Sequence, residues 1–440
     1  MVCKLTTLRH ILILTNILAI CMARGIFISL LPPFYPPEAL KRGATPTQYG
    51  FVFGISNLPI VLFSHIFGKY GNCAKICFIT GSLLGGISGF VFGFLTEIND
   101  ADSFIGLSYF LRFLEGVGGA MAWSSGIGIL IKIFPNNIAR TLSWTESSWS
   151  MGYLIGPAIG AGLYEAGGFM FPFFFIGTLI IMTSLPLICV IPNGNTIPTE
   201  SQNDESMLLV KCESNENLDR NKQLKSHCDP DNGSQETSLG IWTIFSSREL
   251  IFCLSDIFSA ECGIGMLESM LGPHMTKTGA STLEIGMSFL ALGCCHCIGN
   301  ILVGWAIDKV GYPTHFSLAG EVMFMMASTF VGPLSFIPME PTKHLIQCMM
   351  ALVGLAHSTI ACSSFVRVHK QVLRMGFTDD IRTYVMISGT WTSFFALGLM
   401  VGSTLSGFIV DLVGFRCTTI FFFFLYSTLA IFNTISCMLS

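Results

Sequence analysis

The chain has 440 residues, of which 51% are hydrophobic and only 11% are charged, and its mean hydropathy is +0.65. Ordinary soluble domains carry about 25% charged residues, so this composition excludes a water-facing surface over most of the molecule. The net charge of -4 provides no basic field that would attract nucleic acid. Most of the 16 cysteines lie in apolar runs, where they are interpreted as small buried side chains rather than as a disulfide framework.

Twelve apolar stretches are long enough to cross a bilayer as helices, which takes about 20 residues each. The first is too long for a signal peptide and has no small-residue cleavage site before Pro32. A polar interval at 193–240 predicts a disordered linker between an N-terminal six-helix bundle, 1–192, and a C-terminal one, 241–440. We therefore expect an all-α membrane protein. The predicted spans are 10–31, 48–67, 76–95, 104–131, 141–163, 170–191, 250–271, 285–307, 316–337, 345–366, 384–410 and 417–438.

The distribution of Lys and Arg between the two ends of the spans predicts the orientation. With a cytoplasmic N-terminus, sixteen of them, Arg367 included, fall on the cytoplasmic side and five on the opposite side. Both termini and the linker are therefore expected in the cytoplasm, and the sequon at Asn232 in the linker is expected to stay unglycosylated. The sequence leaves open whether the membrane is vesicular or the plasma membrane.

Two loop patterns occur once in each half. Gly304-Trp-Ala-Ile-Asp308-Lys309-Val-Gly311 follows the eighth span, and a weaker copy that contains Gly68 and Lys69 follows the second. The segments 163–169 and 409–415 form the other pair. A repeated six-span unit indicates a transporter whose substrate site lies between two halves.

Glycine spacing predicts close helix contacts. Glycines recur every fourth residue over 81–93 in the third span and over 152–160 in the fifth, and small residues at this spacing let helix backbones approach in lipid. Within the second series, Gly156 is followed by Pro157, which removes a backbone donor and is expected to bend or break the helix.

Several of these motifs resemble the major facilitator superfamily. The Gly304–Gly311 pattern resembles its signature loop, Arg112-Phe-Leu-Glu115-Gly-Val-Gly resembles its proton-coupling motif, and 152–160 resembles its fifth-span antiporter motif. The segments 33–43, 49–54, 134–137 and 156–164 are similar to the vesicular amine and polyamine transporter branch. The resemblance implies the twelve-helix major facilitator fold, alternating access, and a gate built from Gly304, Asp308, Lys309, Gly311, Gly68 and Lys69.

The chain departs from that branch in two respects. Gly68 stands where the signature loop would have an acid. Vesicular monoamine transporters carry carboxylates in the first, tenth and eleventh spans, whereas here these spans hold none before Asp411, and the first holds Arg24 instead. The substrate of the branch is therefore not transferred to this chain.

Charged side chains within the spans are the candidate site residues, because each costs roughly 2.5–3.5 kcal/mol at mid-bilayer unless it has a partner, water or a function. Arg112 and Glu115 share a helix face and form either a self-neutralising pair or a proton relay. Glu261 and Glu268 share a face of the seventh span about 10 Å apart, a spacing suited to a di- or polyamine. Glu146, between Trp144 and Trp149, suits an organic cation, or else belongs to an interfacial aromatic belt.

Other polar residues of the spans are given structural roles. Asp256 and Glu268 lie near helix ends, where simple hydration is the alternative to a binding role, and Glu321 is placed at a membrane edge. His296, within a Cys-Cys-His-Cys run, is interpreted as packing rather than metal ligation. For His357 a hydrogen bond between helices is favoured over protonation. No metal or cofactor site is predicted.

The leading hypothesis is a monomeric secondary active transporter that exchanges a small organic cation for protons across a lipid bilayer. One alternative is a carrier of an anionic or neutral solute with Arg24 and Arg112 as anchors, and another is a non-transporting receptor or scaffold on the same fold. The chain contains no nucleotide-binding loop of the Gly-x4-Gly-Lys-Ser/Thr type and no catalytic constellation, so we do not expect an enzyme.

Overall fold

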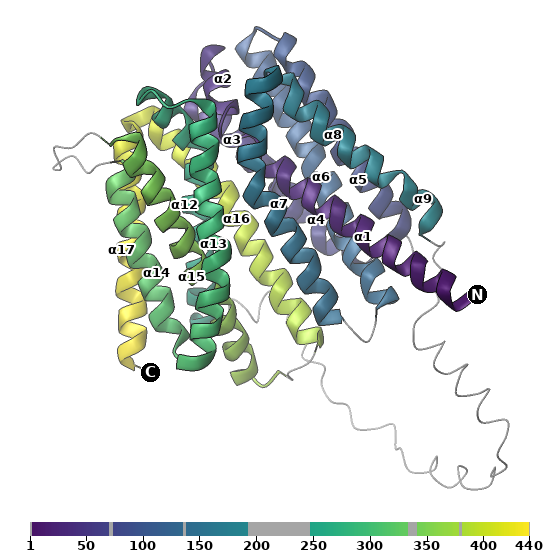
Figure 1. The fold of residues 1–440 in the computed structure, drawn as a ribbon. Helices are drawn as coiled ribbons and strands as arrows, with labels where there is room; N and C mark the ends of the chain where they lie inside the picture. The colour runs from purple at the N-terminus through teal and green to yellow at the C-terminus, as the bar shows by residue number, and fades with distance from the viewer. Residues whose placement is uncertain are drawn as a thin grey trace.

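The computed structural model describes residues 2–69, 74–134, 138–191, 247–332, 341–377 and 381–439, and its elements in these ranges are all helices. The helices form two bundles that lie side by side, α1 to α9 in the first and α12 to α17 in the second (Figure 1). The predicted linker, its boundaries with the two bundles and the sequon at Asn232 lie outside the described residues, so the division at 192 and 240 stays a prediction.

The helices coincide with the predicted spans. The second, third and sixth spans each consist of two pieces, whereas the other nine are single helices. Eight helices among the described residues are long and apolar enough to cross a membrane. The first bundle contains α1 (Val2–Ser29), α2 (Tyr35–Lys41), α3 (Pro46–Ile55), α4 (Leu58–Lys69), α5 (Ala74–Phe92), η2 (Gly93–Glu97), α6 (Ala101–Ile133), α7 (Ile138–Gly167), α8 (Met170–Ser184) and α9 (Pro186–Val190). The second contains α12 (Arg248–Lys277), α13 (Thr282–Val310), α14 (Pro313–Val331), α15 (Lys343–Arg374), α16 (Ile381–Val413) and α17 (Phe415–Leu439).

The two bundles repeat one packing pattern. In the first, α1 packs on α7, α4 on α6, and α5 on both α6 and α8. In the second, α12 packs on α16, α13 on α15, and α14 on both α15 and α17. Between the bundles, α3 contacts α16 and α7 contacts α13, which are again equivalent pairs. This arrangement is expected of a repeated six-span unit whose halves face each other.

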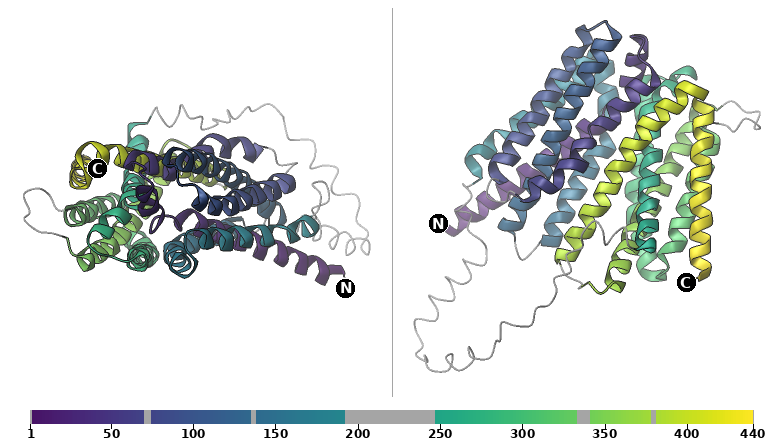
Figure 2. Two further views of the ribbon diagram at one scale, coloured as in Figure 1. Left: turned by 90° about the horizontal axis from the view of Figure 1, so that it is seen from above. Right: turned by 180° about the vertical axis from the view of Figure 1, so that it is seen from behind.

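The bundles diverge toward one end of the molecule, as the views from the front and from behind show (Figures 1 and 2). We call this the proximal end, because the chain leaves α9 and enters α12 there, and the opposite end the distal end. At the distal end two carboxylates join the bundles. Asp411 on α16 accepts hydrogen bonds from the Thr47 backbone nitrogen (2.8 Å) and hydroxyl on α3. Glu165 on α7 accepts one from the Leu283 backbone nitrogen on α13 (2.9 Å).

Glycines bring α7 against α1. A Cβ added at Gly152 would lie 2.0 Å from the Met22 carbonyl oxygen, and one at Gly160 would lie 2.6 Å from that of Leu30. Gly156 faces α1 in the same way, so the glycine series gives the close contact that its spacing predicts. The helix continues through Pro157 without a break, and a bend there stays a prediction.

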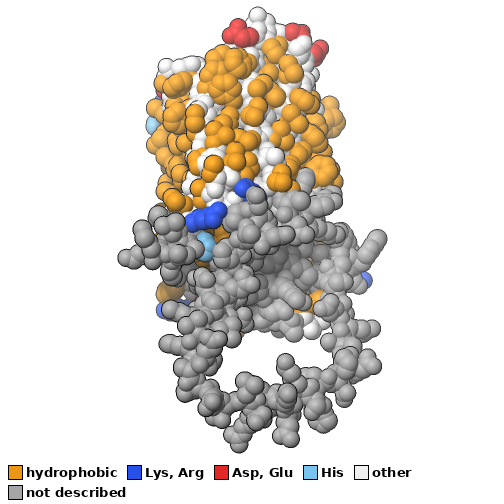
Figure 3. Space-filling view, turned by 90° about the vertical axis from the view of Figure 1, so that its right-hand side faces the viewer, with side chains coloured by type: hydrophobic (Ala, Val, Ile, Leu, Met, Phe, Trp, Pro, Cys, Tyr) orange, Lys and Arg blue, Asp and Glu red, His pale blue; other side chains and the backbone are white. Residues whose placement is uncertain are grey.

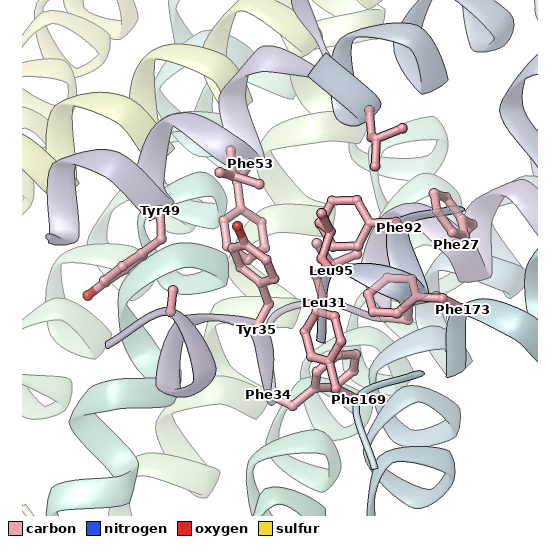
Figure 4. Packing of buried hydrophobic residues seen from close by; sticks show 14 of the residues in the cluster. Phe27, Leu31, Phe34, Tyr35, Tyr49, Phe53, Phe92, Leu95, Phe169 and Phe173 are labelled. Atoms are coloured by element: carbon pink, nitrogen blue, oxygen red, sulfur yellow. The ribbon is translucent and has the colours of Figure 1, made fainter. Parts of the chain in front are cut away.

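An aromatic core closes the distal end of the first bundle. Figure 4 shows Phe34 and Tyr35 among rings that come from α1, α3, α5 and α8 and from the residue before α8, with Leu95 of η2 beside them. The Tyr35 ring stacks on Phe104 with centroids 5.6 Å apart, and the Phe34 ring stacks on Tyr164 at 4.9 Å. On the side displayed in Figure 3, an apolar band lies between acidic side chains at the distal end and Lys and Arg side chains toward the proximal end. Such a band is suited to contact with lipid.

Candidate functional site: a cavity between the two bundles

A cavity of about 450 Å³ lies between the bundles, toward the proximal end. Helix α7 supplies its wall in the first bundle, and α12, α13, α15 and α16 supply the wall in the second. A cavity of this size falls in the range of small-molecule sites, which is about 300–1,000 Å³.

The cavity wall is acidic and aromatic. Glu146, Glu261 and Asp308 contribute to it, whereas none of the described residues that line it is Lys or Arg. Five Phe, Tyr and Trp rings among the described residues line it: Trp149 and Tyr153 on α7, Phe365 on α15, and Trp391 and Phe395 on α16. The Trp149 ring is stacked on Tyr153 (centroids 5.1 Å apart) and lies edge-on to Phe395 across the bundles (6.3 Å). Aromatic faces beside carboxylates attract organic cations.

Glu261 is the deepest of the three acids. Its side chain is fully buried on α12, and its Oε1 lies 2.5 Å from His357 Nε2 on α15. His357 Nδ1 in turn lies 3.0 Å from His296 Nδ1 on α13, whose Nε2 lies 3.0 Å from the Asn300 side-chain nitrogen. The favoured interpretation of His357, a hydrogen bond between helices, is thus present in the structure. His296 was expected to do no more than pack, but it is part of the cavity wall.

Two glycines make this meeting of histidines possible. A Cβ at Gly354 on α15 would lie 1.9 Å from the Leu292 carbonyl oxygen, and one at Gly299 on α13 would lie 2.1 Å from the Ser358 hydroxyl. Both glycines lie about one helical turn from the histidine of their own helix, so α13 and α15 cross closely where the rings meet. Within the described residues, no group of three or more His, Cys, Asp or Glu side chains is arranged to hold a metal ion.

The other predicted acids lie at different distances from the cavity. Glu146 is exposed near the proximal end of α7 and lines the cavity. Glu268 is half-buried and accepts a hydrogen bond from the Tyr153 hydroxyl, so it lies directly behind one of the lining rings. Arg112 lies close enough to act on the Glu268 carboxylate electrostatically.

Glu115 and Arg112 belong to a buried ion-pair triad in the first bundle. Glu115 Oε2 lies 2.9 Å from Arg112 Nη1, as their spacing predicts, and Oε1 lies 3.6 Å from Arg24 Nη2 on α1. Gly85 and Gly119 flank the Arg24 guanidinium, which occupies the space that a side chain at either position would need. None of the triad lines the cavity, so Arg24 and Arg112 are not placed to anchor an anionic solute there.

The gate motif lies where α13 ends, at the proximal end. Gly304 and Asp308 line the cavity, and the Lys309 ammonium lies 4.3 Å from the centre of the Trp305 ring. Gly311 ends the helix with φ +78°, a left-handed conformation that favours glycine. Gly68 and Lys69 are the last two residues of α4, and the side chain of Lys69 lies outside the described residues.

Three charged residues of the second bundle lie in its interior. Glu321 is fully buried on α14, where Oε1 accepts a hydrogen bond from Asn433 of α17 (2.6 Å), and its placement at a membrane edge stays a prediction. Arg367, counted above among the charges of the cytoplasmic side, is a buried residue of α15 that donates to Asp256 of α12. Asp256 is therefore not simply hydrated, and Asn433 also contacts it at 3.3 Å. The helices extend beyond the apolar windows, so polar residues that appear terminal in the sequence lie inside the bundle.

Comparison with known proteins identifies the family. The sequence model of the Major Facilitator Superfamily matches residues 13–378 of this chain. The MFS-type transporter SLC18B1 of Rattus norvegicus is 26% identical over 393 residues, covering 88% of this chain and 78% of that protein. The chromaffin granule amine transporter of the same species is 23% identical, covering 74% of this chain and 55% of that protein.

Solved structures share the fold. A bacterial homologue of the human lysosomal transporter Spinster, in an inward-facing and occupied conformation, superposes with a TM-score of 0.70 at 11% identity, covering 97% of this chain and 96% of that one. The family match spans most of the chain, and the relatives named above are transporters that resemble it along most of its length. This chain therefore belongs to the major facilitator superfamily and is a multi-pass membrane transporter, not an enzyme.

Proposed function

We propose that the protein is a secondary active transporter that moves a small organic cation, an amine or polyamine, by alternating access in exchange for protons. The observation that carries this proposal is the cavity between the bundles, whose described lining contains three carboxyl side chains and neither Lys nor Arg. An acidic cavity concentrates cations and rejects anions, because low-dielectric walls focus the field of the carboxylates.

The aromatic wall supports the same class of substrate. A cation against the face of Trp or Tyr gains about 0.5–2 kcal/mol, the larger value when both are desolvated. Trp149 and Tyr153 belong to one bundle and Trp391 to the other, so a cation held among them would contact both halves. The chromaffin granule amine transporter and a vesicular acetylcholine transporter are named for organic cations, which supports this substrate class for their relative.

The arrangement of the bundles supports alternating access. The cavity lies toward the proximal end, whereas Asp411 and Glu165 join the bundles at the distal end. The proposed cytoplasmic location of the termini and linker would make this the inward-facing state. The Lys and Arg side chains at the proximal end of the apolar band in Figure 3 support that orientation.

Transport by purified protein in liposomes tests the proposal. Labelled spermidine, a polyamine, and labelled tryptamine, an aromatic monoamine, are offered with and without an imposed pH gradient. We expect one or both to accumulate only with the gradient, and equal uptake in empty liposomes would refute transport. Uptake that ignores the gradient would refute proton exchange.

Variants connect the measured transport to the cavity. Glu146→Gln removes an acid of the cavity wall, and Trp149→Ala is expected to raise the half-saturating amine concentration about 2- to 30-fold, the equivalent of one lost cation–π contact. Phe424→Ala is the control, because the Phe424 ring on α17 is exposed and does not line the cavity. An unchanged half-saturating concentration in both cavity variants would contradict the substrate site proposed here.

A further inference from the structure

The hydrogen bonds around His296 and His357 are all satisfied by one set of proton positions between Cys362 and Glu261, which we assign from the donor at one end of the chain of bonds. The Cys362 thiol donates to Asn300 Oδ1 (3.4 Å), which leaves the Asn300 amide nitrogen as the donor to His296 Nε2 (3.0 Å). A neutral His296 then carries its proton on Nδ1 and donates it to His357 Nδ1 (3.0 Å). His357 therefore carries its proton on Nε2 and donates it to Glu261 Oε1 (2.5 Å). The whole chain of bonds runs in one direction and ends on a carboxylate.

We propose that His296 and His357 form a proton relay that connects the cavity with Glu261, and this inference rests on the proposed exchange of an organic cation for protons. A proton from the cavity binds His296 Nε2 after the Asn300 amide turns aside. The proton on His296 Nδ1 passes to His357 Nδ1, and the proton on His357 Nε2 passes to Glu261 Oε1. One proton enters, both histidines end neutral in their other tautomer, and Glu261 ends as a neutral acid.

The second oxygen of Glu261 supports this role independently. Oε2 is enclosed and has no hydrogen-bond partner among the described residues. A buried acceptor without a partner is costly, and for a carboxylate the cost is larger than for a neutral group. Either a bound cation or a transferred proton relieves that cost. The two occupants exclude each other, because a proton on Glu261 removes the charge that attracts the cation, and mutual exclusion is what an exchanger requires.

The groups around the relay that can exchange protons are carboxyl, phenol and thiol side chains, and Glu146 and Asp308 of the cavity wall are among them. The titratable groups near Glu261 are Tyr153 on α7, Tyr426 on α17, and Cys262 and Glu268 on its own helix. Helix α16 contributes Gly398, whose Cβ, if present, would lie 2.7 Å from that of Glu261. Cys297 and Cys362 flank the histidines in the cavity wall. No described Lys or Arg lines the cavity, so the histidines are its basic groups.

The test compares two transport modes of the full-length protein in liposomes. The first is accumulation of labelled spermidine driven by a pH gradient, and the second is exchange of labelled for unlabelled spermidine without a gradient. Exchange needs cation binding and rocking but no proton transfer. The variants are His357→Gln and His296→Gln, which keep a hydrogen-bonding side chain but do not ionise. His274→Gln is the matched control, since His274 bonds the Val331 carbonyl oxygen and stacks on Phe415 away from the cavity.

We expect both relay variants to lose gradient-driven accumulation by about 100-fold, the contribution typical of a positioned proton carrier, and to keep exchange. The control should keep both. Wild-type accumulation of spermidine that ignores the gradient would refute the proposed proton exchange itself, before any variant is considered. Gradient-driven accumulation retained in either relay variant would overturn the relay alone. So would loss of exchange in a variant whose melting temperature matches the wild type, because the histidines would then bind the substrate. A pH-sensitive dye inside the liposomes, reading the proton released per spermidine taken up, should lose its signal in the same two variants.

Discussion

Replacement of Glu115 by Gln is expected to destabilise the first bundle severely. Glu115 is the only carboxylate in the triad with Arg24 and Arg112, and the three side chains are at most 8% exposed. Gln keeps the size of the side chain and an acceptor oxygen, so the variant removes the negative charge and little else. Two guanidinium groups would remain buried without their counter-charge. Breaking a buried ion pair in this way costs about 3–5 kcal/mol.

The matched control is Lys343→Gln, which breaks the ion pair between Lys343 and Glu284 at the distal end. That pair is shorter (2.6 Å) than either contact of the triad, but its side chains are 37% and 34% exposed. Exposed pairs contribute about 0–1 kcal/mol, so the control should lower the unfolding temperature only slightly. Both variants are heated in detergent at one scan rate with tryptophan fluorescence as the probe, because irreversible unfolding makes the midpoint depend on rate.

A second substitution sharpens the interpretation. The double variant Glu115→Gln with Arg24→Gln removes one of the two uncompensated charges, so it should unfold at a higher temperature than Glu115→Gln alone. The reasoning is refuted if Glu115→Gln unfolds no earlier than Lys343→Gln, or if the double variant is the least stable of the set.

Three further outcomes are expected. Gly354→Ala should lower the unfolding temperature and gradient-driven uptake together, because its Cβ would meet a backbone carbonyl at 1.9 Å, whereas Gly162→Ala, with nothing within 4 Å, should change neither. Asp256→Asn should lower the free energy of unfolding by about 3–5 kcal/mol, because it removes the carboxylate that faces a buried guanidinium. Glu321→Gln should lower it far less, and a comparison of the two melting temperatures tests this. Burial by itself would raise the pKa of Glu38, but hydrogen bonds from its neighbours bring that pKa below its ordinary 4.5. Its stabilisation is therefore present above pH 4.5 and lost as the pH falls through the lowered pKa, so Glu38→Gln and wild type should converge in melting temperature in acid.

Hydropathy predicted the spans well because the thickness of a bilayer sets the length of an apolar helix. It did not predict that the second span divides between Ile55 and Leu58 or that the sixth divides at Pro186, because composition reports where a segment is apolar and not whether its backbone is continuous. Pro59 and Pro186 were the available signals, since proline favours the first turn of a helix.

The candidate site was predictable in its residue types and not in its pairings. Glu146 and Glu261 were identified because carboxylates are costly within spans, and both contribute to the cavity wall. Spacing within one helix could pair Arg112 with Glu115, but it carries no information about Arg24 on another helix. The role of His357 depends in the same way on contacts of α15 with α12 and α13.

The two carboxylates at the distal end have a consequence for the free energy of the proposed alternating access. Asp411 accepts from the backbone of the second residue of α3, and Glu165 from that of the second residue of α13. At these helix N-termini the unbonded amides and the helix dipole stabilise a negative charge. Both carboxylates are also exposed, so water can take the place of each lost bond as the bundles part. Each such contact is worth only about 0.3–1 kcal/mol, so under the proposed mechanism the two contacts would favour the closed distal end without locking it. The two contacts are equivalent in kind and weak, so thermal motion is enough to break both.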